Sequence, residues 1–446
     1  MTANDQFQQL IQVPLETLDE ASPALLIILD ALDECDDTYA SELFRLIGGL
    51  IDKLTVQIKM FITSRSEPHL QQCYTSDALT SQLETHSLGE EKPELVEDDI
   101  SVYFKERLPG MVKQWVANAP DWPGEEKRLA LVRKAQGLFI CATTVARMLA
   151  DPTIRDPEGQ LEAILSSSKP INLDEIYAQI LERACPLSPD GNLLARFRNV
   201  LGALVVARVP INIHALASLL SPDGSQDQEF AHRIRITVLS YLQAVLIISD
   251  VEASKVAQDA QPIRFIHSSF IDYLTDRSRC DPRFLLDLSD EHSKLAVGCL
   301  RRMRDLKRNM CNLDPSLLNS EVEDLDQRIK DNMSPGLQYA CAYVSIHVSQ
   351  TPSESAEVRE LVEEFANTRL MNWLEGLSLM GRIPEAVGMA VSMESWLKVR
   401  VAVSTTFIGI ADHPLPRTVL ISSQLCHHLF RTWCRLFPPP IPLSFI

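Results

Sequence analysis

An apolar run that leads into three carboxylates constrains this chain more than any other feature of its sequence. Residues Leu25 to Leu29 are all leucine or isoleucine; Asp30 follows at once, and Asp33 and Glu34 come shortly after it. A continuous apolar run of this length predicts a parallel strand that is buried on both faces. Ligands of open α/β sheets bind beyond the carboxyl ends of the strands, so we expect Asp30 to emerge at a binding crevice.

The carboxylates after this run suit the phosphate end of a nucleotide site. Asp30 could hold Mg²⁺, directly or through water, while Asp33 or Glu34 could orient an attacking water. A strand of this kind works together with a phosphate-binding loop of the pattern G-x-x-x-x-G-K-[ST]. No Gly-Lys pair occurs in the sequence. The chain therefore carries one half of the pattern for nucleotide hydrolysis.

A second strand is predicted at residues 59–63, within a run that ends at Thr63, Ser64 and Arg65. We expect it to lie next to the first strand or to be separated from it by a missing strand. A guanidinium at the end of a neighbouring strand can bond two phosphate oxygens at once, which suits recognition of a γ-phosphate. The alternative is a solvated strand end without a ligand. The two strand ends together favour a nucleotide site more strongly than either strand end does alone.

An ordered series of motifs resembles the NACHT-type signal-transduction NTPases, and within them the fungal set related to the NOD-like receptors. The resemblance covers roughly residues 15 to 400. The motifs that carry it are LLIILDALDEC and FITSRSEPHL, then GLFICATT at 137–144, LDEIY at 173–177 and RFIHSSFIDYL at 264–274. Since the phosphate loop is absent, we expect an N-terminally truncated member of this family.

The resemblance implies Mg²⁺ and ATP or ADP as cofactors of full-length relatives, with none bound tightly here. It implies Asp30 as the magnesium ligand, Asp33 and Glu34 as vestigial water-orienting residues, and Arg65 and His267 as nucleotide-binding residues. In the family, a histidine in a similar F-[IL]-H-x-[ST]-F segment reaches the β-phosphate of ADP and helps to keep the closed state shut. The alternative for His267 is a buried side chain that caps the following helix.

A third motif departs from the family. The segment Gly137-Leu138-Phe139 resembles the place where relatives carry Gly-Leu-Pro against the adenine. Because Phe139 replaces the proline, we expect a core position for this side chain rather than an adenine contact.

The predicted fold is an α/β N-terminal partial P-loop sheet followed by predominantly α-helical domains, one of them a winged-helix-like module. The expected divisions are residues 1–85 with the Walker B and sensor strands, a helical subdomain at 86–168, the winged-helix-like domain at 169–280, a helical domain at 281–400 and an atypical tail at 401–446. In the winged-helix-like domain we expect helices over 173–183, 193–207 and 214–220, extended segments at 244–248 and 263–266, and a helix from about Ser268. Apolar stripes at helical spacing predict helix packing between 337 and 348 and between 370 and 377.

Composition excludes several classes of protein. The net charge of −18 argues against binding to nucleic-acid backbones, and no apolar run approaches the ~20 residues of a membrane span. The ten cysteines contain no C-x-x-C pair, which favours a reduced, cytoplasmic location. The expected partners are proteins, among them further copies of the chain.

Two functions remain open from the sequence. The first is a fragment of a NACHT-type nucleotide-dependent regulatory switch, of the innate-immunity or heterokaryon-incompatibility kind, that does not hydrolyse ATP and is not an enzyme as written. The alternative is a non-catalytic helical interaction scaffold derived from such a protein.

Overall fold

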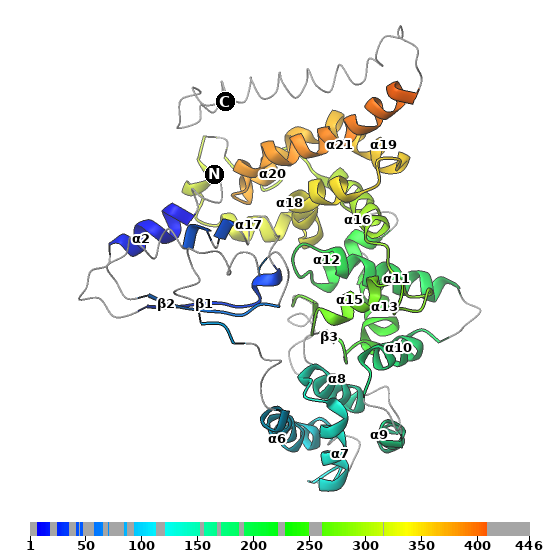
Figure 1. Ribbon diagram of the computed structural model, residues 1–446. Helices are drawn as coiled ribbons and strands as arrows, with labels where there is room; N and C mark the ends of the chain where they lie inside the picture. Colours follow the sequence, from blue (N-terminus) through cyan, green and yellow to red (C-terminus); the bar gives the residue numbers. More distant parts are fainter. Residues whose placement is uncertain are drawn as a thin grey trace. The chain divides into compact units, whose positions relative to one another are not determined.

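The computed structural model describes most of the chain (Figure 1). The described residues are 7–17, 25–34, 42–43, 45–47, 58–65, 70, 84–86, 93–112, 121–151, 156–166, 171–186, 191–221, 228–248, 261–314 and 316–407. The chain divides into two compact units, residues 1–92 and 93–446, and each is described here by itself. Cys426, His427, His428 and Cys434, whose spacing in the sequence fits no zinc-binding pattern, lie outside the described residues.

The first unit contains the two predicted strands, β1 (Leu25–Leu29) and β2 (Ile58–Ile62). They pair in parallel, with Leu25 opposite Ile58 and Leu29 opposite Ile62. Of the two arrangements that the sequence left open, the structure shows adjacent parallel strands without a third strand between them. The other described elements of this unit are a helical segment made of η1 (Gln8–Gln12) and α2 (Val13–Glu16), and the 3-10 turn η2 (Leu32–Glu34).

The predicted burial of the first strand on both faces was wrong. Leu29 and Met60 pack against a small core formed by Phe7 and Ile47. On the opposite face Leu26 and Ile28 are each 62% exposed. Successive strand residues point to opposite faces, so cover on one side protects only every second residue. An apolar sequence run thus specified the strand but not the layer that covers it.

We expect the exposed strand face to promote self-association, because uncovered apolar sheet surface is prone to pairing. Replacing both Ile28 and Phe61 by threonine keeps β propensity and should reduce concentration-dependent association in analytical ultracentrifugation. Leu318→Thr, at an exposed leucine of the second unit, is the matched control and should leave association unchanged. Equal association of all three proteins would contradict the expectation.

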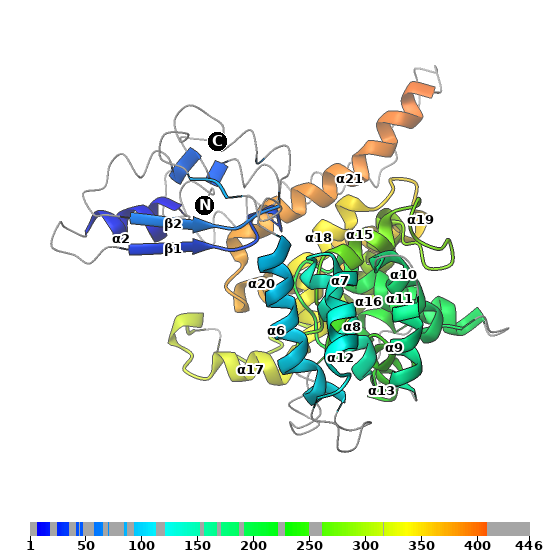
Figure 2. The ribbon, with the colours of Figure 1, turned by 60° about the horizontal axis from the view of Figure 1, so that its bottom comes forward.

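The second unit is mostly helical, as predicted. Figure 2 shows α6, α7 and α8 beside one another. The α-helices of this unit are α6 (Pro93–Val112), α7 (Glu125–Ala135), α8 (Phe139–Ala150), α9 (Pro157–Ser166), α10 (Leu173–Ala184), α11 (Gly191–Val206), α12 (Ile213–Leu220), α13 (Gln228–Thr237), α15 (Ser269–Thr275), α16 (Leu288–Arg302), α17 (Leu325–Asn332), α18 (Pro335–Gln350), α19 (Ala356–Thr368), α20 (Leu370–Leu379) and α21 (Ala386–Phe407). Helix α21 runs past residue 400, where the atypical tail was expected to begin.

In the segment predicted as winged-helix-like, α10, α11, α12 and α15 lie where the sequence placed helices, whereas α13 was not predicted. Asn172 and Asn212 cap α10 and α12 by accepting hydrogen bonds from backbone N–H groups, which explains why these helices begin there. The two extended segments form a short antiparallel pair, β3 (Leu246–Ile247) and β4 (Arg264–Phe265). Whether this arrangement is a winged helix stays a prediction.

Helices α16 and α18 pack along each other at the centre of this unit (Figures 1 and 2). The predicted stripe of α18 is confirmed, since Leu337, Cys341, Val344 and Val348 are all buried. On α16, Gly298 lies against helix α12: a Cβ at this position would be 2.1 Å from the carbonyl oxygen of Leu219. A glycine is therefore required here by a close approach of two backbones.

We expect Gly298→Ala to lower the free energy of unfolding by about 1–3 kcal/mol, because α16 must move away from α12. Gly388→Ala is the control in α21, where a Cβ would meet nothing within 4 Å. There alanine should be neutral or stabilise by up to ~1 kcal/mol through helix propensity. Urea unfolding of both variants measures the difference, and equal stabilities would contradict it.

A pair of histidines, His347 buried and His292 half-buried, joins α16 to α18. His347 Nδ1 lies 2.9 Å from His292 Nδ1, and His347 Nε2 lies 2.9 Å from Tyr339 Oη. The Tyr339 hydroxyl accepts from the backbone N–H of Arg208, so its own proton can go to His347 Nε2. The proton of His347 then sits on Nδ1 and is donated to His292. Each of these hydrogen bonds has one donor and one acceptor when both imidazoles are neutral.

This relay predicts a loss of stability in acid. Burial lowers the pKa of His347 from 6.5 to about 3, with His292 and Arg208 adding to the shift, and burial also lowers the pKa of His292. Since the folded values lie below the unfolded one, the stabilisation is complete above pH 6.5 and is lost as the pH falls below it. We expect the free energy of unfolding to drop by about 1–3 kcal/mol between pH 6.5 and ~4.

Denaturant titrations over this pH range measure the slope of stability against pH. His347→Asn should flatten the slope, whereas His232→Asn, at an exposed histidine of α13, should keep it. A wild-type slope in the His347 variant would contradict the assignment to this pair.

Candidate functional site

The carboxyl ends of β1 and β2 bring the predicted phosphate-side residues together. Because Leu29 is opposite Ile62, the residues that follow, Asp30 and Thr63, emerge side by side. The ladder continues past both strands: Thr63 N–H donates to the Leu29 carbonyl and Leu32 N–H donates to the Thr63 carbonyl, each at 2.9 Å. The turn after β1 is thus attached to β2 by backbone hydrogen bonds.

Asp30 is held by a threonine that the sequence analysis did not single out. The Thr63 hydroxyl donates to Asp30 Oδ1 and accepts from the backbone N–H of Ala31 at 2.8 Å. Ala31 has a φ of 54°, a left-handed conformation that is unfavourable for a residue with a Cβ. The hydroxyl therefore fixes both the aspartate and the strained turn. The signal for it was the strand-end hydroxyl directly before Ser64 and Arg65.

Arg65 meets Asp33 across the same strand ends. Its backbone N–H donates to Asp33 Oδ1 at 3.0 Å, and its Nε lies 3.4 Å from Asp33 Oδ2. The Asp33 side chain is 13% exposed, whereas that of Arg65 is 40% exposed. Both oxygens of Asp33 are therefore engaged by Arg65, and a water-orienting role would require this contact to open. Glu34 is the last residue of the turn η2.

The donor set partly fits magnesium. Asp30 is exposed, and it offers a carboxylate next to a hydroxyl, both of them hard oxygen ligands. Mg²⁺ needs few protein ligands when water and phosphate oxygens complete its shell. Within the part of the chain that the structure describes, no three His, Cys, Asp or Glu side chains gather in a group that could hold a metal. Asp30 could hold the ion only as one ligand among solvent and phosphate oxygens.

His267 is in the second unit, between β4 and α15, and its side chain is exposed. Its Nδ1 accepts a hydrogen bond of 3.1 Å from the backbone N–H of Ser269 and lies 2.8 Å from the Ser269 hydroxyl. The alternative was a buried histidine that caps the following helix. The hydrogen bond from the Ser269 N–H agrees with it, but the exposure of the His267 side chain does not. We expect His267 to face the carboxyl ends of β1 and β2. Because His267 and these strands belong to two units that are described separately, this stays a prediction.

The expected core role of Phe139 was wrong. Phe139 is 42% exposed at the start of α8, with its ring edge against Tyr103 of α6 at a centroid distance of 6.2 Å. Leu138 before it is exposed as well. The helix start places both side chains ahead of the buried face of α8, which begins at Cys141.

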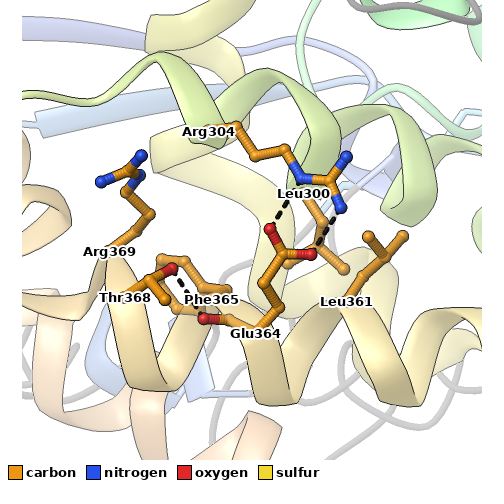
Figure 3. A pocket seen from close by; sticks show the side chains of 7 residues that line it. All are labelled: Leu300, Arg304, Leu361, Glu364, Phe365, Thr368 and Arg369. Atoms are coloured by element: carbon orange, nitrogen blue, oxygen red, sulfur yellow. Dashed lines mark hydrogen bonds and ion pairs between the residues drawn. The ribbon is translucent and has the colours of Figure 1, made fainter.

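A small cavity in the second unit is not a nucleotide site. It lies between α16, the turn after it and α19, and its volume of about 10 Å³ is that of one water molecule (Figure 3). Arg304 spans it and donates to both carboxylate oxygens of Glu364, at 2.9 and 2.5 Å. This contact lowers the pKa of Glu364. The ion pair therefore connects the turn after α16 to α19.

Among the described helices, none combines the length and the apolar character that a bilayer crossing needs.

Comparison with known proteins gives two similarities. Residues 1–65 match the family described as Nephrocystin 3, N-terminal. Over 394 residues, which are 83% of this chain, the sequence is 24% identical to the vegetative incompatibility protein HET-E-1 of Podospora anserina. The chain spans 26% of the length of that relative. No solved structure matches the chain. The two similarities support a relation to the NACHT family that the motifs resemble.

Proposed function

We propose that the chain is part of a NACHT-type, nucleotide-dependent regulatory switch of the incompatibility or innate-immunity kind. The observation that carries the proposal is the convergence of Asp30, Asp33 and Arg65 at the ends of two paired parallel strands. These residue types suit a magnesium ion and the terminal phosphate of ATP or ADP. The similarity to an incompatibility protein supports the signalling role.

We further propose that this chain does not hydrolyse ATP. Phosphate affinity in P-loop proteins comes largely from the backbone N–H groups and the lysine of the loop, and the sequence has no G-x-x-x-x-G-K-[ST] pattern. Asp30 and Asp33 alone repel a nucleotide that lacks its metal. The Arg65 guanidinium is engaged by Asp33 and must leave it to meet a phosphate.

A second candidate is the helical interaction scaffold. It is favoured by the same contacts, because Thr63 satisfies Asp30 and Arg65 satisfies Asp33 without any ligand. In this alternative the strand ends stabilise the turn after β1 and the helical unit binds partner proteins. Both candidates fit protein partners, self-association and a cytoplasmic location, the last because the six described cysteines are all free and buried.

Calorimetry with Mg-ATP tests the proposal. We expect no micromolar binding by the wild-type chain and no phosphate release in a coupled assay. Asp30→Ala should then give the same weak signal, as should Glu126→Ala, at an exposed glutamate of α7 used as the control. Micromolar affinity that disappears in Asp30→Ala and persists in Glu126→Ala would show a working site and overturn the claim of weak binding.

A further inference from the structure

Two hydroxyl groups lie behind His267: one belongs to Ser269 in the same motif, and the other belongs to Tyr177 in a motif far away in the sequence. Tyr177 of α10 is 1% exposed, and its Oη lies 2.8 Å from the Ser269 hydroxyl at the start of α15. The same Ser269 hydroxyl lies 2.8 Å from His267 Nδ1. The motifs LDEIY and RFIHSSFIDYL therefore meet through a hydrogen-bonded chain from Tyr177 to Ser269 to His267.

The backbone settles where the protons of this chain lie. Ser269 N–H is a fixed donor, and it points at His267 Nδ1 at 3.1 Å. A ring nitrogen that accepts a hydrogen bond carries no proton, so the neutral ring has its proton on Nε2. The Ser269 hydroxyl then donates to Nδ1 and the Tyr177 hydroxyl donates to Ser269. The opposite direction would set an N–H of His267 against the N–H of Ser269.

The packing around Tyr177 makes its hydroxyl a fixed donor. Its ring lies against Phe270 and Tyr273 of α15, with centroid distances of 4.9 and 5.6 Å. Arg279, after α15, donates to both carboxylate oxygens of Asp174 at 3.0 and 2.7 Å and ties the start of α10 to the same segment. Burial raises the pKa of Tyr177, which keeps the hydroxyl protonated. Helices α10 and α15 therefore hold the relay as one piece.

We propose that Tyr177 and Ser269 are positioning residues that hold His267 as the Nε2–H tautomer. The ring geometry turns Nε2–H away from the Ser269 side, where it is a hydrogen-bond donor of fixed direction. Such a donor suits an anionic oxygen, whether of this chain or of a ligand that displaces it, and the identification of that ligand with a nucleotide phosphate rests on the proposed function. The tautomer itself follows from the contacts within the second unit.

Nitrogen NMR of the full chain, labelled with ¹⁵N-histidine and measured without nucleotide near neutral pH, tests the positioning. His267→Gln assigns the resonances. We expect an acceptor-type shift at Nδ1 and a protonated shift at Nε2, with the Nε2–H form in roughly fivefold to tenfold excess. A predominantly Nδ1–H ring in the wild-type chain would overturn the proposal.

Four variants separate positioning from a general structural effect. Ser269→Ala and Tyr177→Phe should each reduce the tautomer excess by about threefold, since each removes one hydroxyl of the relay. Ser269→Thr keeps a hydroxyl and should restore the wild-type shifts. Tyr241→Phe, whose hydroxyl lies outside the relay, is the matched control for loss of a tyrosine hydroxyl and should change nothing. Wild-type shifts in Ser269→Ala would overturn the role of the hydroxyls.

The proposed function and this inference are tested by independent measurements, so either one can fail without the other. Calorimetry with Mg-ATP tests the nucleotide site, whereas the nitrogen shifts are recorded without any nucleotide. A chain with a working ATP site could still show the wrong tautomer, and the correct tautomer could occur in a chain that never contacts a phosphate.

Discussion

The parallel register of β1 and β2 is the constraint on which the candidate site depends. With Leu29 opposite Ile62, the backbone of Thr63 bonds to residues on both sides of the Asp30–Ala31 turn. A shift by one residue would reverse the facing of every side chain in the strand and separate these partners. The left-handed Ala31 can persist because the strand ladder, the Thr63 hydroxyl and the turn η2 over-determine it.

The same register explains why one set of residues is compatible with two functions. The acids and the arginine are of the residue types that the proposed metal and phosphate would require, and in this structure Thr63 contacts Asp30 and Arg65 contacts Asp33. Arg65 contacts a carboxylate of its own chain through Nε, and a phosphate oxygen would compete with that carboxylate for the same guanidinium. A loop of backbone N–H groups would shift that balance toward phosphate by adding donors that Asp33 cannot replace.

The helical unit is specified by polar groups inside an apolar core. Trp373 and Trp396 donate from their indole nitrogens to the carbonyls of Cys341 and Thr351, which ties α20 and α21 to α18 and to the residue that ends it. Asp151, whose side chain is fully buried, is paired with Arg183 at 2.9 Å. Buried groups of this kind are stable only in one arrangement of the helices, because any other leaves them without partners. The histidine pair and the Tyr177 relay follow the same rule.

Local pattern in the sequence determined the elements and the strand-end chemistry. Apolar runs gave both strands, cap residues such as Asn172 and Asn212 gave helix starts, and the strand-end positions of Asp30 and Arg65 followed from the polarity of parallel sheets. These features depend on residues that are close in the sequence, or on the rule that the carboxyl ends of parallel strands lie at the same edge of a sheet. They can therefore be predicted without knowledge of the tertiary contacts.

Tertiary structure decided which side chains share a hydrogen bond and which apolar surface is covered. Nothing in the spacing of Tyr177 and Ser269, or of His292 and His347, predicts contact, because these pairs form only when separate helices dock. The sequence also did not show that the side chains of Leu26, Ile28 and Phe139 are exposed. An apolar residue type does not reveal whether another layer of the fold covers it. Residue type fixes what a group can do, and the packing of distant elements fixes which partner it meets.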